Sequence, residues 1–271
     1  MDISALNERG MVLVGCGRMG GALLDGWLRN GVKPGAVHVI EPNPRPDLAQ
    51  KGVVLDGDLP ADPAVLFIAV KPQMMADVLP RLAQFGRDGT LVMTVAAGTT
   101  IATYEKAFPG AAIVRAMPNT PAAIGQGISA ILGNARATEA DMDLARALMQ
   151  AVGRVVRISH EDQMDAVTAV SGSGPAYVFL FLEAMTQAGV DMGLTAEQSY
   201  RLGVATFQGA SELAARSTES ADVLRQRVTS KGGTTHAAIT HMQAQQVPEH
   251  FVAAMRAAET RAKELAAEFG R

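Results

Sequence analysis

Residues 11–20 read Met-Val-Leu-Val-Gly-Cys-Gly-Arg-Met-Gly, and this stretch decides the fold of the N-terminal half. Its apolar run predicts a strand, its glycines have the spacing G-x-G-x-x-G, and an apolar pattern of helical period follows at once. Gly15 permits the tight turn, Gly17 lets the backbone approach a pyrophosphate, and Gly20 lets the helix lie close to the strand. The N–H groups at the start of that helix are free to bind phosphate. The stretch therefore predicts a dinucleotide site that includes Gly15, Gly17, Arg18, Met19 and Gly20.

The bulk composition limits the class of protein. The chain has 271 residues, 48% of them apolar, and a net charge of -3 at pH 7. Its length is near the size at which one hydrophobic core stops growing, which predicts two domains. No run of Lys and Arg stands out, which argues against a nucleic-acid partner. Because the apolar runs are shorter than a membrane span and no signal-peptide core is present, we expect a cytoplasmic protein with no membrane partner.

Cysteine usage limits the chemistry further. The single cysteine, Cys16, excludes an internal disulfide framework and any Cys-rich metal site. We interpret it as a small packing residue of the glycine turn. His236 and His241 are separated by the wrong spacing for a shared helix face, so both are interpreted as structural. No metal site is expected.

Short apolar runs alternate with helical patterns as far as about Ser159. The expected strands are residues 37–40, 53–55, 65–70, 90–95, 113–116, 128–132 and 155–158. The first helix is expected to end at Asn30-Gly31, and another to begin at Thr138 with Asp141 in a capping box. This alternation predicts the α/β class, with an N-terminal Rossmann-like, doubly wound sheet in a dinucleotide-binding domain of residues 1–162.

The ends of these strands supply further candidates, because ligands of an open parallel sheet lie beyond the carboxyl ends of its strands. The candidate cofactor residues are Glu41, Asn43, Ala69, Val70, Lys71, Pro72, Ala96, Ala97 and Asn119. Lys71 is assigned to ribose or phosphate, with general acid as the alternative. Small residues at 96–98 leave room for a flat ring, although close packing of a helix would require them equally. Asn119 and Thr120, in Met117-Pro-Asn-Thr-Pro, either cap the backbone or face the site.

Glu41 bears on the choice of cofactor. An acid about twenty residues past the glycines can accept both ribose hydroxyls, which favours NADH. Asn43 with Arg45 could instead bind the 2′-phosphate of NADPH, and a solvated loop is the third alternative. The sequence therefore predicts NADPH or NADH and leaves the preference open.

From residue 163 the pattern is helical to the end, which predicts an all-helical C-terminal domain of residues 163–271. Thr195 with Gln198 is expected to cap one helix, and Pro248 to lie in the first turn of the last. An apolar stripe follows, formed by Phe251, Met255, Ala258, Ala262, Leu265 and Phe269. Together with the apolar run 177–182, this stripe predicts a face that a twofold partner would cover.

Two segments are expected to interrupt the helical pattern. Residues 171–177 read Ser-Gly-Ser-Gly-Pro-Ala-Tyr, and residues 228–235 read Val-Thr-Ser-Lys-Gly-Gly-Thr-Thr. The second segment opens a helix, so its N–H groups are suited to an anion such as a carboxylate. The alternative is a helix–helix turn capped by threonines.

These motifs resemble those of the pyrroline-5-carboxylate reductases. The resemblance runs from the glycine turn through Ala69-Val-Lys-Pro, Val95-Ala-Ala-Gly and Met117-Pro-Asn-Thr-Pro to the long motif that begins at Asp165 and ends at Tyr177, and then to residues 228–235. It covers nearly the whole chain, and the last two motifs are the specific ones. It implies NAD(P)H-dependent reduction of 1-pyrroline-5-carboxylate to L-proline, the last step of proline biosynthesis.

The resemblance also implies roles for individual residues and an assembly. The implied substrate-binding residues are Glu161, Ser230, Gly232, Gly233, Thr234 and Thr235, with Asp165 as a neighbour. The loop backbone would hold the substrate carboxylate, and Thr235 is the catalytic candidate, its hydroxyl bonding the ring nitrogen. The implied assembly is a homodimer through the helical dimerisation domain, extended to a decamer of five dimers. Two rival functions stay open: another imine or hydroxyacid reductase, and a regulator that senses a dinucleotide.

Overall fold

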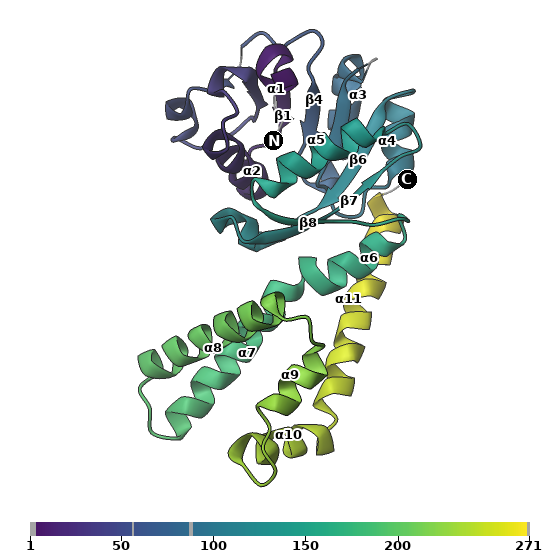
Figure 1. The fold of residues 1–271 in the computed structure, drawn as a ribbon. Coiled ribbons are helices and arrows are strands. Elements are labelled where there is room, and N and C mark those ends of the chain that lie inside the picture. The colour runs from purple at the N-terminus through teal and green to yellow at the C-terminus, as the bar shows by residue number, and fades with distance from the viewer. Residues whose placement is uncertain (1–3, 56, 87–88, 270–271) are drawn as a thin grey trace. The chain divides into compact units, whose positions relative to one another are not determined.

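The computed structural model describes residues 4–55, 57–86 and 89–269 (Figure 1). The chain divides into two compact units, Met1–Ser173 with Ala258–Arg271 (unit 1) and Gly174–Ala257 (unit 2). This division falls after the predicted boundary at residue 162, because Met164 of helix α6 packs with Ile101 and Leu132 of the sheet-bearing unit. The end of the last helix is grouped with unit 1 for a similar reason, since Leu265 lies against Gly98.

Within the described residues, unit 1 is built on an eight-stranded sheet of order β3-β2-β1-β4-β5-β6-β7-β8. The strands are β1 (Met11–Val14), β2 (Val37–Ile40), β3 (Val54–Leu55), β4 (Val65–Ile68), β5 (Leu91–Thr94), β6 (Ala112–Met117), β7 (Gly127–Gly133) and β8 (Gly153–Arg157). Strands β6 and β7 pair antiparallel, and the other pairs are parallel. Each expected strand is confirmed, and so is the doubly wound sheet. Its strand order reverses between β1 and β4, which is where such sheets bind ligands.

Helices cover both faces of this sheet (Figure 1). They are α1 (Ser4–Arg9), α2 (Arg18–Arg29), α3 (Met75–Leu82), α4 (Ile101–Ala107), α5 (Glu139–Gln150) and α6 (Gln163–Val167), with short turns η1 (Pro34–Ala36), η2 (Leu48–Lys51), η3 (Pro72–Met74), η4 (Ala83–Phe85), η5 (Thr120–Ile124) and η6 (Thr168–Gly172). Met11 and Leu13 pack in the layer with α1, α2 and α5, whereas Val12 and Val14 pack in the layer with α3 and α4. Because central strands are buried on both faces, they read as continuous apolar runs.

Predicted helix ends are confirmed where local side chains set them. Asn30 is the C-cap of α2. Thr138 and Asp141 form the capping box of α5, with the Asp141 N–H donating to Thr138 Oγ1 at 3.2 Å. Thr195 and Gln198 do the same for a helix of unit 2, with the Thr195 N–H donating to Gln198 Oε1 at 2.9 Å. Each pair satisfies N–H groups that the first helical turn leaves unpaired.

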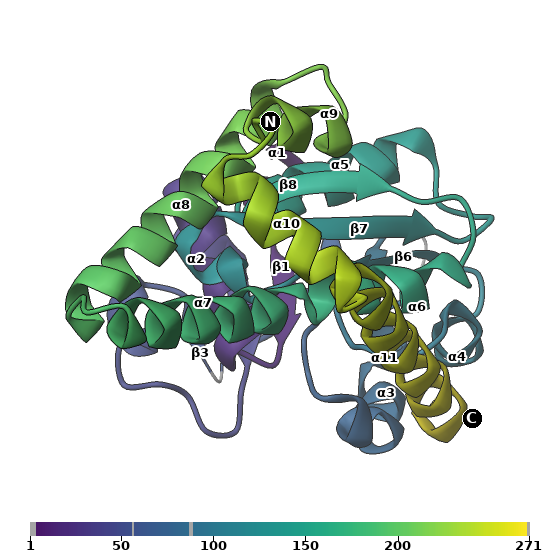
Figure 2. The ribbon, with the colours of Figure 1, turned by 90° about the horizontal axis from the view of Figure 1, so that it is seen from below.

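The described residues of unit 2 are helical, as predicted. Its helices are α7 (Gly174–Asp191), α8 (Ala196–Arg216), α9 (Ala221–Arg227), α10 (Thr234–Ala244) and the first part of α11 (Val247–Phe269) (Figure 2). Helices α7 and α8 form a hairpin that approaches closely at Gly203, where a Cβ would lie 3.2 Å from Leu182 Cδ2. Tyr177 and Phe181 of α7 contact the ring of Phe251 in α11, with centroids 5.6 and 5.8 Å apart.

Unit 2 leaves much of its apolar surface exposed. Phe179 and Leu180 of α7 are 59% and 63% exposed, and Leu202 and Leu213 of α8 are 58% and 59% exposed. The side chain of Phe269, part of the predicted stripe, lies outside the described residues. Large apolar side chains with this exposure are typical of a surface that meets another protein.

The expected interruption at residues 171–177 is wrong in form. Helix α6 passes into a π turn, η6, in which the Ser173 N–H donates to Thr168 O at 2.8 Å, and α7 begins at Gly174. Glycine and serine therefore accompany a widened helical turn here, not an open loop.

Candidate active site

The glycine turn has the geometry that its sequence predicts. Gly15 has a φ of +88°, and a Cβ there would lie 2.8 Å from Ala69 O. A Cβ on Gly20 would overlap Gly15 O. A Cβ on Gly17, in contrast, would meet no atom within 4 Å. The fold therefore requires Gly15 and Gly20, whereas Gly17 faces open space.

The start of α2 completes an anion-binding site beside that space. Gly17 is the N-cap of α2 and has no side chain to occupy the N–H groups of the first turn, which begins at Arg18 and continues through Met19. Unpaired N–H groups and the positive end of the helix dipole favour a phosphate. The residues present thus fit the pyrophosphate of a dinucleotide.

A cleft of about 660 Å³ opens from the glycine turn. Seven predicted cofactor residues line it: Gly15, Gly17, Glu41, Asn43, Ala69, Val70 and Lys71. Further lining residues were not predicted as part of a site from the sequence: Leu59, Met74, Asp77, Val78, Arg81, Leu82, Gln84 and Phe85. Helical periodicity marks α3 as packed, but it does not distinguish packing on the sheet from lining a cleft.

Glu41, just after β2, accepts a backbone hydrogen bond from the glycine turn. Its Oε2 accepts the Cys16 N–H at 2.8 Å, and its Oε1 accepts the Asn43 N–H at 3.1 Å. A carboxylate can accept about four hydrogen bonds, so capacity for ribose hydroxyls remains.

Arg45 is held away from the cleft lining. Its Nη2 lies 3.4 Å from Asp47 Oδ2 and 3.9 Å from Asp25 Oδ2. Three guanidinium atoms lie 3.1–3.3 Å from the position that a Cβ on Gly21 would occupy. Arg45 therefore lies against α2, between acidic partners.

Cys16 is unsuited to nucleophilic chemistry. It is buried, and burial raises the pKa of its thiol to about 11. Because the thiolate is the reactive form, the interpretation as a packing residue agrees with its surroundings.

The small residues after β5 lie where helix α11 packs closely on the chain. Gly98 has a φ of +76°, and a Cβ there would lie 3.3 Å from the backbone of Leu265 in α11. Ala96 is buried and Ala97 is half-buried. Helix packing, one of the two alternatives, therefore accounts for Gly98.

Asn119 caps backbone groups, as one of its two alternatives predicted. Its Oδ1 accepts the Ile128 N–H at 2.9 Å, and its Nδ2 donates to Ser171 O at 3.2 Å. Both ends of its amide are thus engaged within unit 1.

Glu161 is also engaged within unit 1. Its Oε1 accepts the Ile101 N–H at 2.7 Å and a bond from Arg115 Nη1 at 2.8 Å. The Arg115 side chain is only 6% exposed, so this pair neutralises a buried charge. These contacts give Glu161 a structural role, and its contact with substrate stays a prediction.

The predicted substrate loop precedes α10. Gly232 has a φ of +78°, the Gly233 N–H donates to Ser230 O at 3.0 Å, and Gly233 is the N-cap of α10. Because this N-cap has no side chain, α10 does not begin with the threonine cap of the alternative interpretation. The N–H groups at Thr234 and Thr235 remain suited to a carboxylate.

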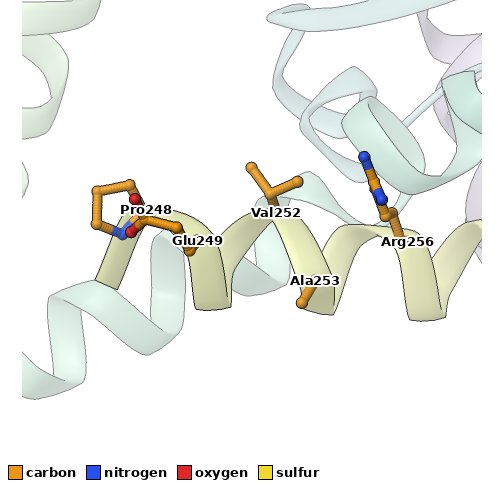
Figure 3. A pocket seen from close by; sticks show the side chains of 5 residues that line it. All are labelled: Pro248, Glu249, Val252, Ala253 and Arg256. Atoms are coloured by element: carbon orange, nitrogen blue, oxygen red, sulfur yellow. The ribbon is translucent and has the colours of Figure 1, made fainter. Parts of the chain in front are cut away.

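A further hollow, of about 350 Å³, lies along α11 (Figure 3). Pro248, Glu249, Val252, Ala253 and Arg256 line it, all from one helix. Small-molecule sites bring polar groups together from several elements, so this hollow is not a candidate.

A metal site and a membrane-spanning helix are two further possibilities. No group of three or more His, Cys, Asp or Glu side chains placed to hold a metal ion was found in the described part of the chain. One helical stretch, Gln163–Asp191, is long and apolar enough to cross a membrane, with a mean hydropathy of 1.2. Length and composition alone are weak grounds for a span, since helices that pack on other protein pass the same test.

Comparison with known proteins adds the family. Residues 161–265 match the family described as pyrroline-5-carboxylate reductase dimerisation, and residues 11–98 match NADP oxidoreductase, coenzyme F420-dependent. The pyrroline-5-carboxylate reductase of Pseudomonas aeruginosa is 38% identical and aligns with 96% of this chain and 98% of its own.

Solved structures agree. A pyrroline-5-carboxylate reductase from Coxiella burnetii has a TM-score of 0.89 at 35% identity, covering 96% of this chain and 99% of that one. The Plasmodium falciparum pyrroline carboxylate reductase, solved with NADP bound, has a TM-score of 0.85 at 26% identity over the same shares. The chain therefore belongs to the pyrroline-5-carboxylate reductase family, NAD(P)H-dependent oxidoreductases that act on a C=N bond in proline biosynthesis.

Proposed function

We propose that this chain reduces 1-pyrroline-5-carboxylate to L-proline with NADPH or NADH, and that the residues predicted from the sequence form its site, with Asn119 supporting that site through backbone contacts. The observation that carries the proposal is the open space at Gly17 beside the N–H groups of α2. Space that no protein atom fills, at the switch point of the sheet, is what a bound pyrophosphate requires.

In this proposal the bound nicotinamide supplies the hydride, and the chain supplies binding and orientation. The α2 N–H groups hold the phosphates, and Glu41 and Asn43 hold the ribose. In unit 2 the N–H groups at Thr234 and Thr235, at the start of α10, hold the substrate carboxylate. The Thr235 hydroxyl bonds the ring nitrogen and so keeps the C=N carbon oriented for attack.

The test of this function is oxidation of NADH and NADPH, followed at 340 nm, with pyrroline-5-carboxylate as substrate. We expect consumption only when the cyclic imine acid is present. Turnover of a different imine or of a hydroxyacid instead would favour the rival reductase. Cofactor binding without turnover of any of them would favour the dinucleotide-sensing regulator.

Glu41 is proposed to make NADH a competent donor. Its carboxylate lines the cleft, where it would repel a 2′-phosphate, while Arg45 is held between Asp25 and Asp47. Glu41→Ser removes the negative charge, so the ratio of kcat/KM for NADPH to that for NADH should rise. An unchanged ratio would assign the preference to other residues.

The chain is proposed to work as a homodimer whose two active sites are each built from both chains. The exposed apolar surface of α7 and α8 supports a second copy as its cover, in preference to lipid, because the matched family segment describes dimerisation. Five such dimers would give the decamer, which light scattering tests by mass.

Two inactive variants test the sharing. One carries Gly17→Trp, and the other carries Ser230→Ala with Thr235→Ala. If the sites are shared, random pairing puts one intact site in half of the dimers, which restores up to about a quarter of wild-type activity. If mixing restores nothing while both variants still dimerise, each chain closes its own site.

A further inference from the structure

The π turn η6 contains a backbone carbonyl, Ser171 O, that lacks the usual α-helical donor. In a continuing α-helix, Ser171 O would accept the N–H of residue 175, but that residue is Pro175, which has no N–H. The π turn uses Thr168 O for the Ser173 N–H at 2.8 Å. Ser171 is half-buried, so a donor from elsewhere in the fold would stabilise its carbonyl.

Asn119 supplies that donor. Its Nδ2 donates to Ser171 O at 3.2 Å, while its Oδ1 accepts the Ile128 N–H, at the start of β7, at 2.9 Å. One amide group thus joins the loop after β6, strand β7 and the π turn. Turning the amide over would lose both bonds, so the two contacts fix its orientation.

A second contact holds η6 at the same place. Met117 is the last residue of β6, and a Cβ on Gly172 would lie 2.9 Å from its Cε. Residue 172 therefore lies beside the Met117 side chain, which places η6 near the carboxyl end of β6.

The end of β6 lies on the edge of the sheet that carries the cofactor cleft. Strands β4, β5 and β6 run parallel, so their carboxyl ends share one edge. The cleft is lined by Ala69, Val70 and Lys71, which follow β4 on that edge. Asn119 follows β6 at that same edge, bonded to Ser171 of η6, and neither residue lines the cleft.

We propose that Asn119 is a positioning residue for hydride transfer, which acts by clamping the π turn to the carboxyl edge of the sheet and not by binding cofactor. With both ends of its amide engaged, the Asn119 side chain fixes residues 171–173, which lie in a motif shared with the family. The inference rests on the proposed function. Loss of the clamp leaves the cofactor site intact and lets the turn shift relative to it.

The test compares Asn119→Asp with a matched control, Asn134→Asp. Asn134 makes the same two kinds of bond at the opposite end of β6, since its Oδ1 accepts the Ile113 N–H at 3.1 Å and its Nδ2 donates to Ala111 O at 3.2 Å. Its Nδ2 also donates to Glu105 Oε1 at 3.0 Å, so Asn134→Asp adds a repulsion between carboxylates and should lose at least as much stability as Asn119→Asp. In both variants the aspartate keeps the acceptor and loses the donor. Both should therefore lower Tm, whereas only the first should alter the reaction.

The expected readout is a split between binding and turnover. A misplacement of about 1 Å costs up to about a hundredfold in rate, so Asn119→Asp should lower kcat tenfold or more. Its Kd for NADH, measured by calorimetry on the free enzyme, should change less than about threefold by the same reasoning. Asn134→Asp should leave both within about twofold.

Other results would overturn the inference. A tenfold rise in the Kd for NADH in Asn119→Asp would make Asn119 a cofactor ligand. Equal kcat losses in the Asn119 and Asn134 variants, or none in either, would make the clamp a matter of stability alone. An inactive wild type would reject the proposed function itself, and the positioning role with it.

Discussion

The two glycines of the turn provide the sharpest separation of binding from folding. Gly17→Ala adds a methyl group where no protein atom lies within 4 Å, at a φ of -69° that does not require glycine. Gly20→Ala adds the same group where it would overlap Gly15 O. The same chemical change therefore enters free space in one variant and the backbone of the protein in the other.

The magnitudes follow from these surroundings. In Gly17→Ala the methyl group keeps the pyrophosphate from the α2 N–H groups, and a hydrogen bond to a charged group contributes about 1.5–3 kcal/mol. Loss of one such bond raises the Kd for NADH by about 10- to 150-fold, with a stability change of about 0.5 kcal/mol or less. Gly20→Ala should destabilise by about 1–3 kcal/mol or more, because backbone must move.

Thermal melting with and without NADH measures both effects. Wild type and Gly17→Ala should melt together without cofactor, and only wild type should gain a large Tm increase from NADH, since a ligand that binds the folded state stabilises it by RT ln(1 + c/Kd) at a free ligand concentration c. Gly20→Ala should melt lower in both conditions. If Gly17→Ala bound NADH as tightly as wild type, or melted as low as Gly20→Ala without it, the assignment of that space to the cofactor would be refuted.

Cys16 of unit 1 is buried, and Asp165 and Glu161 are half-buried. With a thiol pKa of about 11, Cys16 should be ionised in only about one molecule in a thousand at pH 8, so a disulfide reagent should label it only after denaturation; rapid labelling of the native protein would contradict this. Burial raises the pKa of Asp165, so the ionised carboxylate costs stability at neutral pH, and Asp165→Asn should have a higher Tm than wild type at pH 7. This difference in Tm should disappear as the pH falls below the unfolded pKa of 3.8, and a difference that persists at low pH would assign the gain to another cause. Glu161→Gln leaves the buried Arg115 guanidinium without its counter-charge and should cost about 3 kcal/mol in urea unfolding, a loss that would be absent if the pair were only a surface contact.

Much of unit 1 could be predicted from the sequence because neighbouring residues determine it. The α2 turn needs glycine at Gly15 for a positive φ and at Gly20 for close approach, and both requirements act within ten residues. The α5 capping box joins Thr138 to Asp141 across one helical turn. Such local rules decide where an element begins and ends, so they give the order of strands and helices and the place of the crevice.

The partners of the polar residues could not be predicted in this way. The sequence marks Glu161 as a candidate, but its ion pair with Arg115 joins residues 46 positions apart. Arg45 was equally suited to a phosphate by its position after β2, and only the fold brings Asp25 of α2 beside it. Contacts of this kind depend on how separate elements pack, and the sequence pattern of each element alone carries no information on them.

The contact between Asn119 and the π turn could be predicted only in part from the sequence. Pro175 lies four residues after Ser171 and has no N–H, so an α-helix through both residues would leave Ser171 O without its usual donor. The sequence also places an amide, Asn119, in a loop at the carboxyl end of a strand. What it does not give is that these two groups lie 3.2 Å apart, since 52 residues separate them. The fold identifies Asn119 as the donor to Ser171 O. Replacing its side chain should therefore lower turnover while leaving cofactor binding intact.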